Sequence, residues 1–309
     1  MAIYKNILDT IGGTPLVELN ALAHKAGAGA RILAKLEARN PGGSAKDRAA
    51  LYMIRAAESA GALKKGMLLV EPTSGNTGVG LALAAAVLGY QLVLVMPDTM
   101  SIERRKLAAA YGARIVLTPG ALGMRGAVEE AERIAREENG FIPDQFNNPA
   151  NANAHYETTA REILADMAGE PIAAFVSAVG TGGTLTGIGR ALREADADTR
   201  IVAVEPAESP LLSEGRAGSH GIQGIGANFV PGVLDRALID EVMTVKTEDA
   251  LETARMAART EGVLCGISSG AALAAALRLG ARSEFAGRTI VTVLPDTGER
   301  YLSTALFGE

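Results

Sequence analysis

Short apolar runs alternate with longer segments of helical periodicity along most of this chain. Runs rich in Val, Ile and Leu, closed by Gly, Pro or polar turns, are typical of strands buried in a parallel sheet. The segments between them place apolar residues on one face of a helix. Repeated strand–helix–strand units predict an α/β fold, with parallel sheets flanked by helices. We expect strands at 16–19, 32–37, 68–71, 92–96, 115–117, 173–179, 201–204 and 289–294, and helices at 47–60, 101–111, 127–138, 153–167 and 247–261.

An uncharged window from Val79 to Met96 has the length of a membrane span. Gly89-Tyr90-Gln91 interrupts it, and its composition changes from alanine-rich to rich in Val and Leu. We therefore expect a buried helix over 77–88 followed by a buried strand over 92–96. The first seven residues hold no apolar signal core, so neither feature predicts a membrane protein.

Composition and charge exclude several classes of function. Hydrophobic residues make up 48% of the 309 positions and charged residues 21%, as in ordinary globular proteins. A formal net charge of −5 argues against nucleic acid or an anionic membrane as the main partner. One cysteine, Cys265, and three scattered histidines predict no internal disulfide and no metal site. This composition suits a reducing cytoplasm.

The chain is long enough for about two domains. No linker stands out, and the Pro/Asn-rich stretch over 141–151 is the best candidate for a transition between two lobes.

The turn Gly180-Thr181-Gly182-Gly183-Thr184 follows an apolar strand pattern and leads into a helical one. Such a turn directs backbone N–H groups and the positive end of a helix towards one point, and its threonines add hydroxyl donors. These groups suit a phosphate. Leu185 breaks the dinucleotide-loop pattern, and no Gly-Lys pair exists for a Walker loop. A tight turn without a ligand remains the alternative.

Lys46 stands where a Pro-Gly-Gly turn opens a helix. A helix N-terminus disfavours a cation, so the position favours the neutral amine that carbonyl chemistry requires. An ordinary surface lysine in the run Lys46-Asp47-Arg48 is the alternative reading.

A second polar turn, Glu71 to Gly78, contains four hydroxyl or amide side chains within five positions: Thr73, Ser74, Asn76 and Thr77. A helix cap requires one such residue, whereas a small molecule bearing a carboxylate could use several. Ser268 lies in a third polar turn, again before an alanine-rich helix, where a serine cap is the alternative. A phosphate-bearing aldehyde that forms an imine with a lysine is pyridoxal phosphate.

Six motifs follow one another along the chain: Ser44–Arg48, Glu71–Gly78, Gln145–Asn151, Gly180–Thr184, Gly266–Gly270 and Gly298–Thr304. In this order they resemble the cysteine synthase (O-acetylserine sulfhydrylase) family, within the tryptophan-synthase-β-like enzymes of fold type II. The resemblance extends from Ile7 to Phe307. It implies two lobes, each with a mostly parallel sheet flanked by helices: a smaller lobe over 41–150 with a substrate-carboxylate loop, and a larger lobe of 1–40 plus 151–309 with a phosphate loop.

The resemblance also implies a role for each site residue. Lys46 would hold pyridoxal 5′-phosphate as an imine and act as the catalytic base. Asn76 would bond the ring hydroxyl, and Ser268 would face the ring nitrogen, which favours a neutral ring suited to β-elimination. The cofactor phosphate would be bound by Gly180, Thr181, Gly182, Gly183 and Thr184, and the substrate carboxylate by Thr73, Ser74, Asn76, Thr77 and Gln145.

The implied reaction converts O-acetylserine and sulfide to cysteine and acetate through an aminoacrylate. No cation occurs in Gly221–Phe229, which favours the neutral acetyl ester over a phosphoserine substrate. Gly42-Gly43 and Ala45 depart from bulkier residues that are common in the family. The family resemblance further implies a homodimer and binding of the C-terminal tail of serine acetyltransferase.

Alternatives remain at this point. Cystathionine β-synthase, which condenses serine or O-acetylserine with homocysteine, shares much of the pattern, but usually lacks the ending Gly298–Ser303. A nicotinamide dehydrogenase would leave Lys46 unexplained, and a protein with a binding role alone would not need Lys46 and Asn76.

Overall fold

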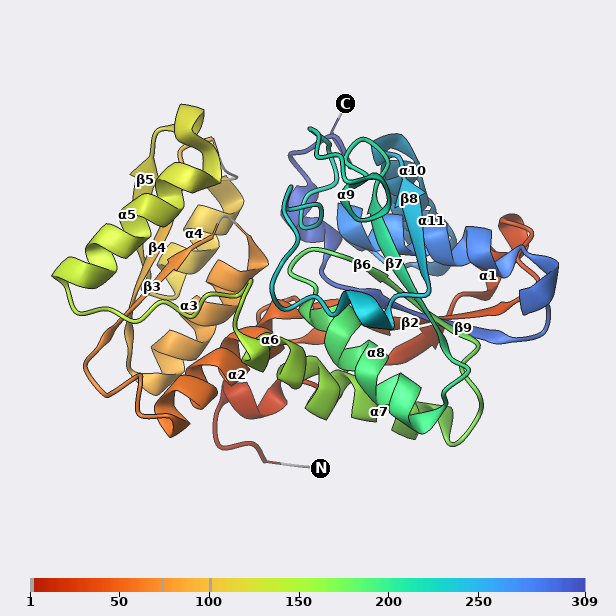
Figure 1. Cartoon of the computed structure of the whole chain (residues 1–309), viewed down its shortest axis with the longest axis horizontal. Coiled ribbons are helices and arrows are strands. Elements are labelled where there is room, and N and C mark those ends of the chain that lie inside the picture. Colours follow the sequence, from red (N-terminus) through yellow and green to blue (C-terminus); the bar gives the residue numbers. More distant parts are fainter. Residues whose placement is uncertain (1–2, 74, 100–101, 309) are drawn as a thin grey trace. The chain divides into compact units, whose positions relative to one another are not determined.

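Residues 3–73, 75–99 and 102–308 are described by the computed structural model of this chain, shown in Figure 1. The chain forms two units. Unit 1 comprises Met1–Ile11 and Asn40–Asn151, and unit 2 comprises Gly12–Arg39 and Ala152–Glu309. The first eleven residues thus group with unit 1, whereas the lobes expected from the sequence placed them with the larger part.

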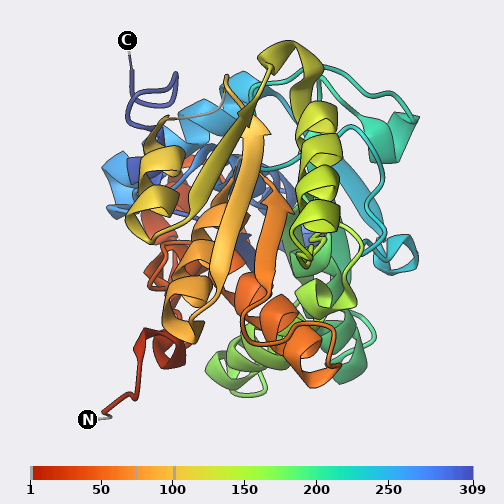
Figure 2. The same cartoon turned by 90° about the vertical axis from the view of Figure 1, so that its left-hand side faces the viewer.

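Unit 1 is built on a parallel sheet of three strands in the order β3-β4-β5 (Figure 2). Alternate residues of β4 face opposite sides: Val93 and Val95 pack under α5, and Leu92 and Leu94 belong to the core with the helices of the other face. This alternation explains why the strand is apolar throughout. The elements are α2 (Lys46–Ser59), β3 (Leu68–Pro72), α3 (Asn76–Leu88), β4 (Gln91–Pro97), α4 (Ile102–Ala110), β5 (Arg114–Thr118) and α5 (Gly123–Glu137).

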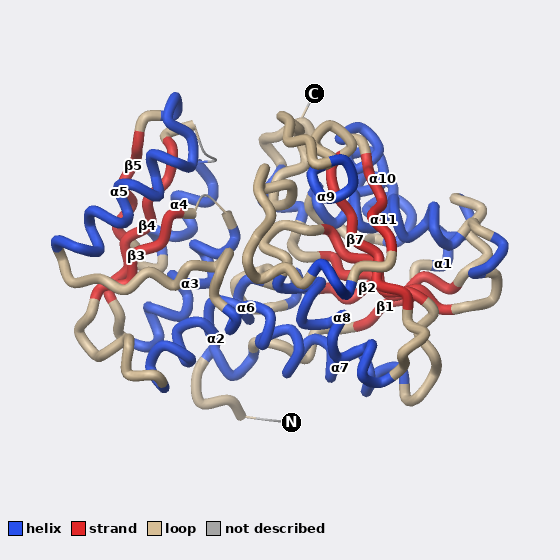
Figure 3. The backbone as a smooth tube through the Cα atoms, viewed as in Figure 1, coloured by secondary structure: helices blue, strands red, loops and turns tan. Residues whose placement is uncertain are grey.

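Unit 2 contains a six-stranded sheet in the order β1-β2-β9-β6-β7-β8 (Figure 3). β1 runs antiparallel to β2, and every other neighbouring pair is parallel. The strands are β1 (Leu16–Glu18), β2 (Arg31–Leu36), β6 (Ala174–Ala178), β7 (Arg200–Pro206), β8 (Glu241–Val245) and β9 (Thr289–Leu294).

Helices cover both faces of this larger sheet. In β7, Val202 and Val204 belong to the core formed with α1, α10 and α11, whereas Ile201 and Ala203 belong to the core formed with α7 and α8. The remaining helices of the chain are α1 (Asn20–Lys25), α6 (Pro149–Ala154), α7 (Ala160–Met167), α8 (Gly183–Ala195), α9 (Leu211–Glu214), α10 (Thr247–Glu261) and α11 (Ile267–Gly280).

The expected α/β class, with parallel sheets flanked by helices, is confirmed. All eight expected strands are present within two or so residues of their bounds. The uncharged window forms α3 followed by β4, as expected, and no described helix has the length and apolar character to cross a membrane.

Several features differ from the expectations. α1 and α9 lie outside the expected helices, and the helix expected over 127–138 begins earlier, at Gly123. β8 was not predicted, because its residues are mostly half-buried and include the charged Glu241. The helix expected over 153–167 is interrupted by a π-helical turn, η4 (His155–Thr159). Such turns replace the regular helical hydrogen bonds locally and are frequent at functional sites.

Candidate active site

Lys46 is the first residue of α2, at the end of a turn that its neighbours hold in place. The carboxylate of Asp47, which is fully buried, accepts the backbone N–H of Gly42 at 2.6 Å. The N–H of Lys46 donates to Ser44 Oγ at 3.2 Å. The turn therefore fixes the backbone from which the lysine side chain projects, at the helix N-terminus expected from the sequence.

A second group of polar side chains gathers at the start of α3. Thr77 Oγ1 donates to Gln145 Oε1 at 2.5 Å, and Gln145 Nε2 lies 3.5 Å from Thr73 Oγ1. All three side chains are buried. Gln145 is distant from the two threonines in sequence, so the fold brings together side chains that the resemblance assigns to one carboxylate.

Asn76 is the first residue of α3, and the N-cap position belongs to Gly75, which has no side chain to cap with. The alternative to a substrate role was a helix capped by Ser74 or Asn76, and Asn76 is not in the cap position. Ser74, the remaining residue expected here, lies outside the described residues. Lys46, Thr73, Asn76, Thr77 and Gln145 all belong to unit 1.

The glycine turn of unit 2 lies between β6 and α8, as the sequence predicts. Its glycines are required by close packing. A Cβ on Gly180 would stand 2.4 Å from the carbonyl oxygen of Gly224, and one on Gly182 would stand 2.6 Å from Leu234 Cβ. Gly182 also has φ +84°, a conformation that favours glycine. The N–H groups of the first turn of α8, a helix of 13 residues, point out of its N-terminus.

His155 lies beside this turn. Its Nε2 is 3.2 Å from Thr184 Oγ1, and its Nδ1 is 2.9 Å from Thr159 Oγ1. The imidazole is fully buried. His155 and Thr159 both belong to η4. The π-helical turn therefore places the imidazole ring against the hydroxyl of Thr184, a residue expected to bind phosphate.

Ser268 is the second residue of α11 and is buried. A Cβ on Gly224 would stand 3.7 Å from Ser268 Oγ, and the carbonyl of the same Gly224 approaches Gly180. Gly226 N also donates to Val179 O at 3.1 Å. The segment around Gly224 therefore contacts both the glycine turn and the start of α11.

Each unit, taken by itself, offers groups whose chemistry suits pyridoxal phosphate. The turn Gly180–Thr184 leads into the N-terminus of α8 and carries two threonine hydroxyls, which are donors that suit a phosphate. Its neighbours leave no room for a side chain at Gly180 or Gly182. Ser268 presents a hydroxyl, which can donate to an unprotonated ring nitrogen. Unit 1 supplies the amine of Lys46 and the amide of Asn76.

Two ionisable groups near these turns have perturbed pKa values. Burial raises the pKa of the Cys265 thiol to about 12, so this cysteine is an unsuitable nucleophile. Burial also raises the pKa of the Glu71 carboxyl to about 8. Among the described residues, no group of His, Cys, Asp and Glu is placed to hold a metal ion.

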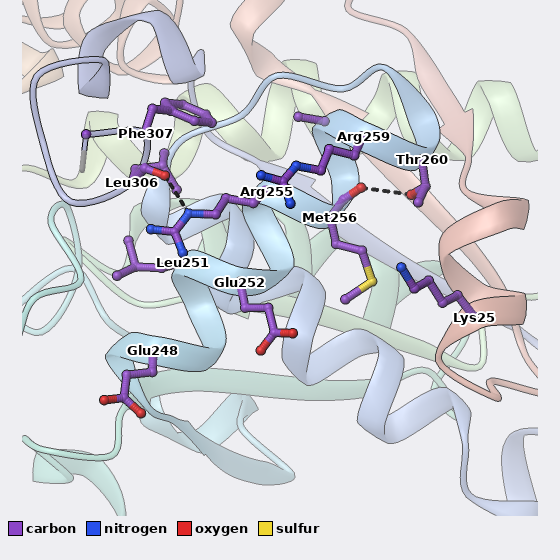
Figure 4. A pocket seen from close by; sticks show the side chains of 12 residues that line it. Lys25, Glu248, Leu251, Glu252, Arg255, Met256, Arg259, Thr260, Leu306 and Phe307 are labelled. Atoms are coloured by element: carbon purple, nitrogen blue, oxygen red, sulfur yellow. Dashed lines mark hydrogen bonds between the residues drawn. The ribbon is translucent and has the colours of Figure 1, made fainter.

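A separate pocket of about 850 Å³ lies along α10 in unit 2 (Figure 4). Arg255 crosses it and donates to Leu306 O at 2.7 Å, which ties the C-terminal segment to the helix. The pocket is lined by none of the residues expected to bind cofactor or substrate.

Comparison with known proteins identifies the family. The model of the pyridoxal-phosphate dependent enzymes matches residues 7–296. The chain belongs to this family. It is pyridoxal-phosphate dependent, and its relatives include cysteine synthases.

One such relative, cysteine synthase of Staphylococcus aureus, is 50% identical over 303 residues, which cover 98% of this chain and 96% of the relative. The crystal structure of cysteine synthase from Entamoeba histolytica superposes with a TM-score of 0.96 at 46% identity, covering 99% of this chain and 91% of that one. A crystal structure of O-ureido-L-serine synthase gives a TM-score of 0.95 at 48% identity, with 99% and 96% covered. These comparisons give no support to the cystathionine β-synthase alternative.

Sequence reasoning assigned no role to His155, Glu71 or Gly224. In the sequence, His155 is one of three scattered histidines, and the segment around Gly224 is marked only by its glycines and by its lack of a cation. The signal for Glu71 was its place at the end of an apolar strand, where a carboxylate must be buried.

Proposed function

We propose that this chain is a cysteine synthase that converts O-acetylserine and sulfide to cysteine and acetate. The observation that carries the proposal is the set of Thr73, Thr77 and Gln145 joined by hydrogen bonds at the start of α3. These donors suit the carboxylate of an amino acid, and the family's cofactor acts on amino acids. The identity to cysteine synthases over nearly the whole chain supports the same substrate.

In this proposal, unit 2 binds the cofactor by its phosphate. The phosphate would be held by the N–H groups of Gly182, Gly183 and Thr184 and by the hydroxyls of Thr181 and Thr184. His155 holds the Thr184 hydroxyl through Nε2. Ser268 Oγ donates to the ring nitrogen. Gly180 is needed because its neighbour Gly224 leaves no room for a side chain.

Unit 1 supplies the groups that handle the amino acid. Lys46 Nζ would hold the cofactor covalently, and Asn76 would form a hydrogen bond with the ring hydroxyl oxygen. The substrate carboxylate is bound by Thr73, Thr77 and Gln145 with Ser74 and Asn76. Bound pyridoxal phosphate supplies an electron-withdrawing ring that makes the Cα proton of the amino acid acidic and lets acetate leave. The amino group of the substrate would displace Lys46 Nζ from the cofactor. The freed Nζ, as the neutral amine, would take the Cα proton and would return it after sulfide has added.

Visible absorption of the purified protein tests this proposal. We expect the band of bound cofactor to shift on addition of O-acetylserine, to return on addition of sulfide, and cysteine to form in equal amount. Lys46→Ala should lower turnover by more than about a hundredfold, as expected for loss of a general base. Lys65→Ala, at an exposed lysine of the same unit, is the control.

Other outcomes would redirect the assignment. A spectral response to O-acetylserine without cysteine formation, but with formation of O-ureido-L-serine from hydroxyurea, would favour the activity named for one relative. A response to serine with homocysteine alone would favour cystathionine synthesis. Full turnover by Lys46→Ala would contradict the role given to this lysine.

Two partners belong to the proposal. We propose that the chain forms a homodimer and that its amino-acid site accepts the C-terminal carboxylate of a serine acetyltransferase tail. The free carboxylate of a peptide end resembles that of the substrate and would use Thr73, Thr77 and Gln145. Light scattering tests the dimer. Competition between a tail peptide and O-acetylserine tests the second partner, and binding without competition would contradict it.

The single, buried Cys265 is consistent with a site of action in the reducing cytoplasm.

A further inference from the structure

Glu71 is a buried carboxylate that the proposed reaction does not use. It lies in β3 with 1% of its surface exposed. Glu71 Oε2 accepts the backbone N–H of Asp144 at 3.2 Å, and the backbone N–H of Gln145 donates to the same carboxylate. The carboxylate therefore holds the peptide that leads directly into Gln145.

Gln145 is held from its other sides as well. Asn151 Nδ2 donates to its carbonyl oxygen at 2.7 Å, and Thr77 Oγ1 donates to its side-chain oxygen at 2.5 Å. Glu71 is the one acidic group among these contacts. Its strength as an acceptor depends on its ionisation, because a carboxylate accepts two N–H bonds more strongly than a neutral carboxyl does.

The backbone at this point is strained. Asp144 has φ +53°, a left-handed conformation that non-glycine residues seldom adopt. Asn147 Nδ2 donates to both oxygens of the Asp144 carboxylate, at 3.1 and 3.0 Å. Strained residues of this kind persist where the surroundings impose them, and here Glu71 and Asn147 hold the two sides of Asp144.

Opposing effects act on the ionisation of Glu71. Burial raises its pKa most, the nearby Asp144 carboxylate raises it further, and the N–H groups of Asp144 and Gln145 lower it, with a net value of about 8. The adjacent strand β4 has no ionisable side chain. The charged residues of α5, which packs on the sheet, form ion pairs with one another: Arg125 with Glu129, Arg133 with Glu130 and Glu137, and Arg136 with Glu132.

We propose that Glu71 is a positioning residue, whose ionised carboxylate holds Gln145 in place to bind the amino-acid substrate and whose protonation loosens that hold. The inference rests on the proposed role of Gln145 in binding the substrate carboxylate. Glu71 touches neither substrate nor cofactor in this scheme. Glu71 acts on the substrate only through the backbone of Gln145, which the proposal places in binding and not in proton transfer. Loss of Glu71 should therefore change KM for O-acetylserine more than kcat.

The test compares the wild-type holoenzyme with Glu71→Gln, a variant that keeps the size of the side chain but cannot ionise. The KM of each protein for O-acetylserine is measured between about pH 6.5 and about pH 9. The amino group of the substrate also titrates in this range, so the ratio of the two KM values is compared at each pH. We expect the ratio of the KM of Glu71→Gln to that of the wild type to be near one at low pH. Above pH 8 it should rise to the order of tenfold, because the variant lacks one charge-assisted hydrogen bond and part of that loss reaches the substrate through Gln145.

Two further variants sharpen the test. Asp144→Asn tolerates the left-handed backbone and removes the negative charge that raises the pKa of Glu71, so the inflection of the wild-type profile should move to lower pH. Glu138→Gln removes an exposed carboxylate of the same unit and should reproduce the wild-type profile.

The possible failures are distinguishable. A ratio for Glu71→Gln that does not change with pH would overturn the positioning role. If instead Gln145→Ala leaves KM unchanged, the proposed substrate site itself is wrong, whatever Glu71 does. Infrared difference spectra between low and high pH report Glu71 without using activity: loss of a protonated carboxyl band should occur in the wild type and not in Glu71→Gln.

Discussion

Gly80 of α3 lies against the backbone carbonyl of Lys46 at the start of α2. A Cβ built on Gly80 would stand 2.8 Å from Lys46 O and 3.2 Å from Ala50 Cβ. The two helices can approach this closely only because position 80 has no side chain. The position of the lysine backbone is therefore set by a glycine 34 residues later in the chain.

Gly80→Ala should displace the N-terminus of α2 and with it Lys46. Overpacking of this kind costs about 1–3 kcal/mol of unfolding free energy. If Lys46 is the proposed base, kcat should fall more steeply than the loss of stability alone explains, since proton transfer depends on its position. Urea unfolding and steady-state kinetics measure the two effects.

Gly189→Ala in α8 is the matched control, because it adds the same methyl group to a helix where the nearest atom stands at 3.4 Å. Its stability should stay level or rise slightly, as alanine favours helix. Equal behaviour of the two variants would contradict the tight contact at Gly80.

Gly42→Ala tests the turn before Lys46. A Cβ here would stand 2.4 Å from Asp47 Oδ1, the carboxylate that accepts the N–H of Gly42. This contact leaves no room for a side chain at position 42. We expect a loss of about 1–3 kcal/mol in unfolding free energy, together with weaker cofactor absorption. Gly29→Ala, whose nearest atoms stand at 3.5 Å, should be nearly neutral, and a similar loss there would argue against the specific contact.

His155→Gln tests the support of the phosphate turn. The variant keeps a polar side chain but cannot place two ring nitrogens between Thr159 and Thr184. The dissociation constant of pyridoxal phosphate should rise on the order of tenfold, the share of one hydrogen bond. The ³¹P resonance of the bound cofactor, which senses the Thr184 hydroxyl, should also move.

Tyr156→Phe removes a neighbouring hydroxyl that donates to Glu194, near the C-terminal end of α8. It should leave the dissociation constant and the ³¹P resonance unchanged. An unaltered ³¹P resonance in His155→Gln would show that the imidazole does not set the phosphate environment.

The parts of this molecule that sequence predicted are those set by local pattern. The turn at Gly180 and the helix start at Lys46 follow from neighbouring residues, so apolar runs and glycines located them. β8 was missed because it lies at the sheet edge, where Glu241 pairs with Arg200 at 2.9 Å and Arg282 at 2.6 Å instead of packing apolar side chains.

The supporting contacts of the site could not be read from the sequence, because they join distant segments. His155 and Thr184 are separated by 29 positions, and Thr77 and Gln145 by 68. No local pattern marks a histidine or a glutamate as a support for another residue. The resemblance supplied the roles of the site residues, but the contacts that hold these residues appear only in the folded chain.

The stability of the fold should itself depend on the ionisation of Glu71. Its pKa is raised from the ordinary 4.5 to about 8, so between these pH values the folded chain keeps a proton that the unfolded chain releases. The stabilising contribution is therefore complete below about pH 4.5 and is lost as pH rises to about 8, with a slope of at most about 1.4 kcal/mol per pH unit for one proton.

Glu71→Gln removes this dependence. The difference in urea-unfolding free energy, variant minus wild type, should increase from about pH 5 to about pH 8 and then stay constant, because other groups titrate equally in both proteins. Glu138→Gln, at an exposed carboxylate, should give a flat difference. A flat difference for Glu71→Gln would mean that its carboxyl ionises normally in the fold. The loss of stability would thus be complete near pH 8, where the carboxyl ionises in the folded chain and begins to strengthen the hold on Gln145. Such a conflict is expected where a buried charge serves a binding site.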